Sequence, residues 1–265
     1  MSFDADTALE PAGPGRWRGF LHPQWRAHRA PHGSFVAALA ARAAILTAGD
    51  RPLRTLATHF LEAPQPGPVE VVAAVEREGR STSSVSVRID YEGAPMALAL
   101  AVLGAWREGE AEWRDASPPP VPPPGELSRL DPDAEGAPRF VRNFDLRPAL
   151  GRPPSGEPGE GLAGGWIRAA DPGVPDAVRL VAYTDAWFPS AFMRLGRIAA
   201  APTLDLTVHI RAPLPPPGMG PEDHVLGAFR TRWATGGLWE EDGELWSPDG
   251  ELLAQSRQLA LLRNS

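Results

Sequence analysis

One carboxylate in this sequence stands where an apolar residue is expected. Between residues 176 and 195, DAVRLVAYTDAWFPSAFMRL carries apolar residues at the spacing of one helical face: Val178, Val181, Phe188 and Phe192. Asp185 falls inside this stripe. A buried carboxylate is costly unless it is hydrogen-bonded or protonated, and carboxylates held in this way can act as general bases. Asp185 is therefore the first candidate for chemistry.

A second interpretation of Asp185 stays open. Pro189 cannot supply the backbone donor that a helix interior needs, so the helix can be distorted there. Asp185 would then be a surface residue beside a kink. If it is buried, another part of the chain must provide its hydrogen-bond partners.

The elements that must position this residue fall into two similar halves. In the first half, PHGSFVAALAARAAILTAGD predicts an Ala-rich helix that begins near Gly33 and ends at Gly49. Alternating segments up to residue 113 predict an antiparallel meander after it. In the second half, strands are predicted in PRFVRNFDLRP and GLAGGWIRAADP, a long helix around Asp185, and four more strands to the end.

The clearest internal echo pairs THFLEAPQP with VHIRAPLP, each placed just after its helix. Repetition of one plan predicts two like domains packed together, at residues 1–113 and 138–265. The intervening residues 114–137 are Pro-rich and poor in large apolar side chains, so we expect an extended linker that does not pack.

Composition limits the classes of function. The net charge is −7, and all 26 basic residues are Arg, so nucleic acid and anionic membranes are poor candidates for partners. Without Cys or Lys there is no thiolate nucleophile, Cys-based metal site or Schiff-base chemistry. No apolar run is long enough to span a membrane and the N-terminus is acidic, so we expect a soluble cytoplasmic protein.

Several short motifs together resemble one family. They are PHGSF at the first helix, HFLEAP, EGRS at a hairpin, YTDAW in the second helix, PTLDLTVH after it, and AQSRQLALL near the end. In order and spacing this set is similar to the acyl-CoA thioesterase II type. The resemblance implies an α+β double hot dog, in which each tandem domain wraps an antiparallel sheet around a long helix. It also implies hydrolysis of acyl-CoA without a metal or organic cofactor.

The resemblance assigns the chemistry to Asp185, Thr203 and Gln258. Strand alternation places Gln258 on a largely apolar face, which favours burial. Thr203 instead alternates with Asp205 and His209 on the polar face, although Pro202 permits an irregular strand start. Alternation therefore supports Gln258 and leaves Thr203 open as a plain surface residue.

Three further residues are candidates for substrate binding. Gly33 and Ser34 begin the first helix, where free backbone N–H groups can face a carbonyl oxygen or phosphate; a plain helix cap is the alternative. Trp187 stands beside the proposed catalytic Asp185, as an acyl-pocket residue or as ordinary core.

Rival functions remain to be weighed. HFLEAPQPG superficially resembles the signature of hot-dog hydroxyacyl dehydratases, but Gly67 leads into a strand-like segment where that signature needs a helix. No G-x-S-x-G motif supports a serine hydrolase. A noncatalytic acyl-CoA-binding double hot dog is the alternative from another class. Edge strands and apolar helices also leave homo-oligomerisation open.

Overall fold

A single antiparallel sheet runs through the computed structural model, which describes residues 2–27, 30–49, 51–106, 109, 112–152, 154 and 156–263. Its thirteen described strands are β1 (Glu10–Gly13), β2 (Arg16–Leu21), β3 (Leu53–Phe60), β4 (Gly67–Glu78), β5 (Thr82–Tyr91), β6 (Ala94–Gly104), β7 (Phe144–Leu150), β8 (Leu162–Ala169), β9 (Thr203–Ile210), β10 (Val225–Arg230), β11 (Ala234–Thr235), β12 (Leu238–Trp246) and β13 (Leu252–Leu261). The α-helices are α1 (Phe3–Asp6), α2 (Gly33–Ala48), α3 (Ala177–Tyr183) and α4 (Ser190–Leu195). Short 3-10 helices are η1 (Pro23–Trp25), η2 (Pro124–Glu126) and η3 (Arg139–Asn143).

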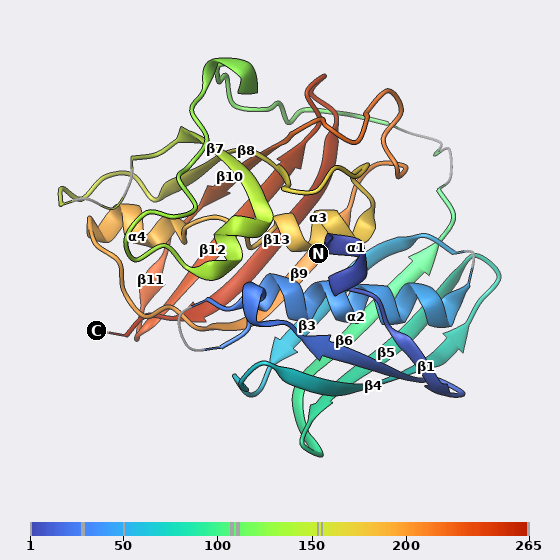
Figure 1. The fold of residues 1–265 in the computed structure, drawn as a ribbon. Coiled ribbons are helices and arrows are strands. Elements are labelled where there is room, and N and C mark those ends of the chain that lie inside the picture. The colour runs from blue at the N-terminus through green and yellow to red at the C-terminus, as the bar shows by residue number, and fades with distance from the viewer. Residues whose placement is uncertain are drawn as a thin grey trace.

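The strand order is β1-β2-β4-β5-β6-β3-β9-β13-β12-β10-β8-β7, with β11 paired to β12. The prediction of a meander after each helix is wrong for the strand that directly follows the helix. The first strand after the helix pairs with the last strand of its half, so β3 lies beside β6 and β9 beside β13. In this arrangement β3 and β9 are free to pair with each other and join the two halves (Figure 1).

The join between the halves is nearly symmetric. The antiparallel register of β3 and β9 pairs Ala57 with Thr207, Thr55 with His209, and His59 with Asp205. The echoed His59 and His209 therefore stand at equivalent positions on either side of the Ala57–Thr207 pair. The sequence echo corresponds to the strand that each half contributes to the centre of the sheet.

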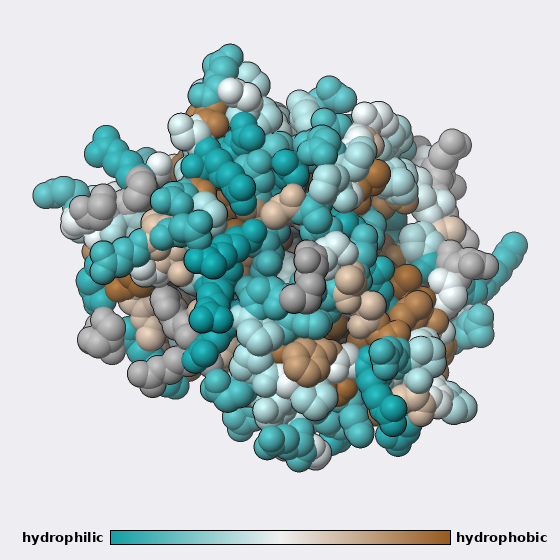
Figure 2. All heavy atoms as spheres, viewed as in Figure 1, coloured by the Kyte–Doolittle hydropathy of each residue, from teal (hydrophilic) through white to brown (hydrophobic). Residues whose placement is uncertain are grey.

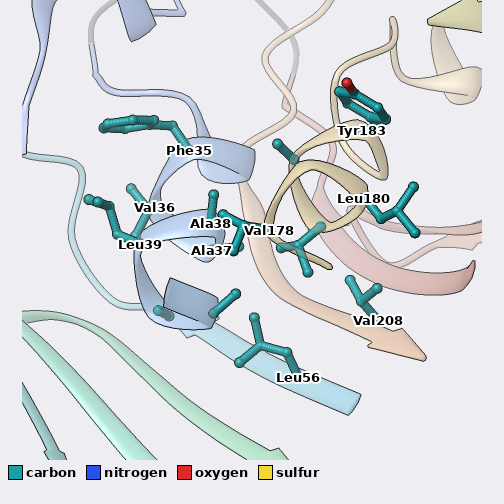
Figure 3. Close-up of a cluster of buried hydrophobic side chains, with 14 of the residues drawn as sticks. Phe35, Val36, Ala37, Ala38, Leu39, Leu56, Val178, Leu180, Tyr183 and Val208 are labelled. Carbon is teal, nitrogen blue, oxygen red and sulfur yellow. The ribbon is translucent and has the colours of Figure 1, made fainter. Parts of the chain in front are cut away.

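Helices α2 and α3 lie side by side against the inner face of the sheet (Figure 1). The small residues of α2 permit this close approach, and its alanines from Ala37 to Ala44 are at most 1% exposed. Leu56 of β3 and Val208 of β9 lie on the sheet beside the two helices (Figure 3). One apolar core thus spans both halves, so the ends of these helices are held by a shared interior.

The prediction of one long helix over residues 176–195 is wrong. Helix α3 ends at Tyr183, and α4 begins at Ser190 with Pro189 at its N-cap. Proline disfavours helical backbone in the preceding residue and lacks a backbone donor, which explains the interruption. Asp185 therefore lies in the connection between two short helices, just past the end of α3.

The expectation that residues 114–137 do not pack is also wrong. Val121 and Leu127 pack on the outer face of the second half of the sheet, against an apolar cluster of Trp166, Leu226 and Trp246. The indole N–H of Trp166 donates to the carbonyl of Pro122 at 2.8 Å. Few apolar residues suffice here, because two tryptophans supply the buried surface.

One predicted strand was placed too early. In PRFVRNFDLRP the first part forms the 3-10 helix η3, and β7 begins only at Phe144. Phe140 and Val141 of η3 are buried, so the apolar residues that suggested a strand serve a helical turn.

Hydrophilic residues cover most of the molecular face shown in Figure 2. Within the described part of the chain, no helix is both long and apolar enough to cross a membrane.

Candidate active site

The Asp185 carboxylate faces the N-terminus of α2 from the opposite half of the chain. The backbone N–H of Ser34 donates a hydrogen bond to it. A Cβ placed on Gly33 would lie 3.1 Å from Asp185 Oδ2, so glycine leaves the space that the carboxylate uses. The first N–H groups of a helix have no partner within it and carry partial positive charge. The half of the chain that contributes the carboxylate therefore depends on the other half to stabilise it.

Gln258 is the second partner of Asp185. Its side chain hydrogen-bonds the Asp185 carboxylate and is 4% exposed. Its Oε1 accepts a hydrogen bond from Thr203 Oγ1 at 3.1 Å. The structure thus brings together Asp185, Thr203 and Gln258, which come from the α3–α4 connection, β9 and β13.

Thr203 reaches this cluster because of a β-bulge. In the pairing of β9 with β13, Leu259 faces Asp205 and Ala260 faces Thr203, so β9 has one extra residue between the two pairs. An extra residue breaks the alternation of faces and re-aims the side chain beyond it. Thr203 therefore turns toward Gln258, and its interpretation as a plain surface residue is wrong.

Glu241 of β12 is a site residue that sequence reasoning missed. It is 4% exposed and pairs directly with Gln258 across the β12–β13 ladder. Its Oε1 accepts from Gln258 Nε2 at 2.7 Å, and its Oε2 accepts from the Ser190 backbone N–H at 2.6 Å. A second carboxylate therefore bonds the same amide that bonds Asp185.

Burial governs the protonation of these groups. It raises the pKa of Asp185 to about 7, with a further rise from the negative Glu241, while the bonds from Ser34 and Gln258 oppose the rise. Burial likewise raises the pKa of Glu241, against hydrogen bonds from Ser190 and Gln258. An Asp that titrates near pH 7 is suited to accept and return a proton.

His32 borders the cluster as a neutral ring. Its Nδ1 lies 3.9 Å from Asp185 Oδ2 and 2.7 Å from Ser34 Oγ, and its ring stacks on Phe140 with centroids 3.8 Å apart. Burial lowers the pKa of His32 to about 3. Near neutral pH it therefore adds no positive charge beside Asp185 and does not offset the rise in the pKa of that carboxyl. His32 belongs to the PHGSF motif, which in the sequence indicated only the beginning of a helix.

Trp187 is 7% exposed and packs near Gly227 of β10, where an added Cβ would lie 3.0 Å from its Nε1. Among the described residues this indole nitrogen has no hydrogen-bond partner. A part in substrate binding stays a prediction for Trp187. In the same described part of the chain, no group of three His, Asp or Glu side chains is placed to hold a metal.

Two central helices against one continuous sheet, with a buried polar cluster between the halves, define a double hot dog. Comparison with protein families agrees. Residues 21–104 match the acyl-CoA thioesterase N-terminal domain, and residues 115–262 match the acyl-CoA thioesterase C-terminal domain. The chain belongs to this acyl-CoA thioesterase family, and the predicted resemblance and fold are confirmed.

Individual relatives cover nearly the whole chain. An uncharacterized protein of Mycobacterium tuberculosis is 28% identical over 93% of this chain and 90% of its own length. A hot dog protein of unknown function from Alicyclobacillus acidocaldarius has a TM-score of 0.88 and 26% identity, covering 99% of this chain and 98% of that one. An acyl-CoA thioesterase II from Mycobacterium marinum shares the fold at a TM-score of 0.74 and 19% identity, covering 100% of this chain and 99% of that one.

Proposed function

We propose that this protein hydrolyses acyl-CoA thioesters to a free carboxylic acid and CoA, with Asp185 as general base. The observation that carries the proposal is the largely enclosed Asp185 carboxylate, 13% exposed, with a pKa raised to about 7 and bonds to Ser34 and Gln258. A carboxylate of this kind can take a proton from water near neutral pH and return it later in the cycle.

The proposed reaction needs no covalent enzyme intermediate. Water attacks the thioester carbonyl carbon as Asp185 takes one of its protons, and the carbonyl oxygen becomes negative. The backbone N–H of Gly33, at the start of α2, is suited to stabilise that oxygen, since the next N–H, of Ser34, bonds Asp185. The C–S bond then breaks, the sulfur leaves as thiolate, and the proton on Asp185 passes to it.

Gln258 and Thr203 have supporting parts in this proposal. Thr203 bonds Gln258 Oε1, which leaves the two amide N–H groups of Gln258 directed at the carboxylates of Glu241 and Asp185. Oriented donors hold the general base in position to take a proton without reorganising during the reaction.

The test is release of CoA thiol from acyl-CoAs of several chain lengths by the wild type and Asp185→Asn. Asparagine keeps the shape but cannot accept a proton, so we expect kcat to fall by about 10²- to 10⁴-fold. Asp205→Asn is the matched control, because Asp205 lies on β9 on the opposite face from the buried Leu206 and Val208. We expect it to retain most of the rate.

Acyl-CoA binding measured by calorimetry separates hydrolysis from the alternative of a noncatalytic binding protein. Tight binding without thiol release from any chain length would support the binding protein. Full turnover by a folded Asp185→Asn variant would instead remove Asp185 from the mechanism.

A further inference from the structure

We propose that Glu241 is a positioning residue of the hydrolytic site, which fixes the orientation of the Gln258 amide through a direct hydrogen bond. The expected effect on turnover rests on the proposed function. The hydrogen bond between Glu241 and Gln258 does not depend on it. Glu241 makes no direct hydrogen bond to Asp185 or Thr203. It acts on the site through Gln258.

The argument begins with the hydrogen-bonding capacity of each group. An ionised carboxylate only accepts, whereas an amide has one accepting oxygen and one donating nitrogen. Glu241 Oε1 lies 2.7 Å from Gln258 Nε2, and Thr203 Oγ1 lies 3.1 Å from Gln258 Oε1. An ionised Glu241 therefore requires the nitrogen of Gln258 on its side and leaves the oxygen for Thr203. The second N–H of that nitrogen is then available to Asp185.

The opposite orientation of the amide is disfavoured by the same contacts. Turning Gln258 over would place its oxygen against the negative Glu241 oxygen and its nitrogen against Thr203. Both carboxylates would then lose a donor, in surroundings where unpaired charge is costly. Glu241 thus selects the one orientation in which Gln258 donates toward Asp185.

Anchoring of the next helix is the competing explanation for Glu241. Its Oε2 accepts from the Ser190 backbone N–H, and the Ser190 hydroxyl lies 2.7 Å from Thr231 Oγ1. Glu241→Gln affects both roles, because a glutamine has one accepting oxygen for two donors, at Gln258 and at Ser190. Gln258→Ala removes the amide but leaves the bond from the Ser190 backbone N–H to Glu241, so adding Glu241→Gln to Gln258→Ala separates the two roles.

A charge effect follows from the same geometry. Among the described residues, the other titratable groups near this pair are His32, 3.9 Å from Asp185, and Glu240, which precedes Glu241 on the opposite face of β12. His32 is neutral near pH 7 because burial lowers its pKa to about 3. Removing the Glu241 charge should therefore lower the pKa of Asp185, and the acid limb of the pH–kcat/KM profile should move to lower pH.

The kinetic experiment introduces Glu241→Gln both into the wild type and into the Gln258→Ala variant. We expect kcat to fall about 10- to 100-fold in Glu241→Gln, and less than about twofold more when it is added to Gln258→Ala. Glu244→Gln, on the outward-facing parity of β12, should leave kcat unchanged. Equal losses from Glu241→Gln in both backgrounds, with an unmoved acid limb, would overturn the proposal in favour of helix anchoring.

A second readout does not need turnover. The side-chain amide protons of Gln258, identified by ¹⁵N NMR through their absence in Gln258→Ala, should shift in Glu241→Gln and stay unchanged in Glu244→Gln. If the wild type hydrolyses nothing, the proposed function fails while this signal still tests the contact. An unmoved Gln258 signal would reject the positioning role even in an active enzyme.

A shorter carboxylate covers the case in which Glu241→Gln does not fold. Glu241→Asp keeps the charge but withdraws the oxygens by one methylene, so the bond to Gln258 should be lost. A folded Glu241→Asp variant with the wild-type kcat would also refute the proposal.

Discussion

Replacing Asp185 with asparagine should stabilise the fold, and the gain should grow as the pH rises. The pKa of this carboxyl is raised from 3.8 to about 7, chiefly by burial. The folded state therefore holds the proton more tightly than the unfolded chain does. Between these two pKa values the wild type loses stability with rising pH, and above about 7 the loss is complete. An asparagine at this position does not titrate and escapes the loss.

The magnitude follows from the size of the shift. About 3 pKa units at about 1.4 kcal/mol each amount to roughly 4 kcal/mol, the full cost of ionising Asp185 in the fold at about pH 8.5. At about pH 5 only the interval above 3.8 contributes, which is less than half of that amount. Asp185→Asn should thus gain about 2 to 3 kcal/mol more at the higher pH than at the lower.

Urea unfolding of both proteins at the two pH values measures this difference. The asparagine also forfeits part of the hydrogen bonding to Ser34 and Gln258, but this cost does not depend on pH and cancels when the two pH values are compared. The free energy of unfolding should rise in the same variant whose turnover collapses. A mutational change in unfolding free energy that is equal at both pH values would refute the reasoning that Asp185 is held at a raised pKa.

Two other substitutions test the surroundings of the site. Gly33→Ala should lower kcat by roughly tenfold with little change in melting temperature, since the new Cβ would lie 3.1 Å from Asp185 Oδ2 while alanine suits a helix; steady-state kinetics and thermal unfolding check both. Arg142→Ala should raise KM about fivefold for acyl-CoA but leave it unchanged for a short acyl-N-acetylcysteamine thioester that lacks phosphates. Arg142 and Arg139 line a hollow of about 410 Å³ on η3, the 3-10 helix whose Phe140 stacks on His32 beside the site. Equal KM changes for both thioesters would exclude a phosphate contact at Arg142.

The parts of the fold that could be predicted are those set by local periodicity. The Ala-rich helix α2 and the alternating strands after it follow from residues close together in sequence. The strand order could not be obtained this way. The pairing of β3 with β9 is decided by which edges remain free once each half has closed on its last strand.

Thr203 shows why alternation alone misplaced a site residue. Counting back from the buried Leu206 and Val208 puts Thr203 on the outer face of a regular strand. The bulge opposite Leu259 and Ala260 shifts that count by one. A one-residue irregularity at the end of a strand depends on the neighbouring strand's path, which residue types do not encode locally.

Glu241 is different, because both its burial and its partner could have been found. In LWEEDGELW it shares a parity with Trp239, Gly243 and Leu245, so a carboxylate falls on an apolar strand face, as Asp185 falls in an apolar stripe of helical spacing in the sequence. A hairpin centred between Asp249 and Gly250, which lie in the turn between β12 and β13, places Gln258 opposite Glu241. The observed register has this pairing. Asp185 was singled out because a charge on a buried face needs a hydrogen-bond donor. The same criterion therefore also identifies Glu241, the carboxylate proposed to orient the Gln258 amide.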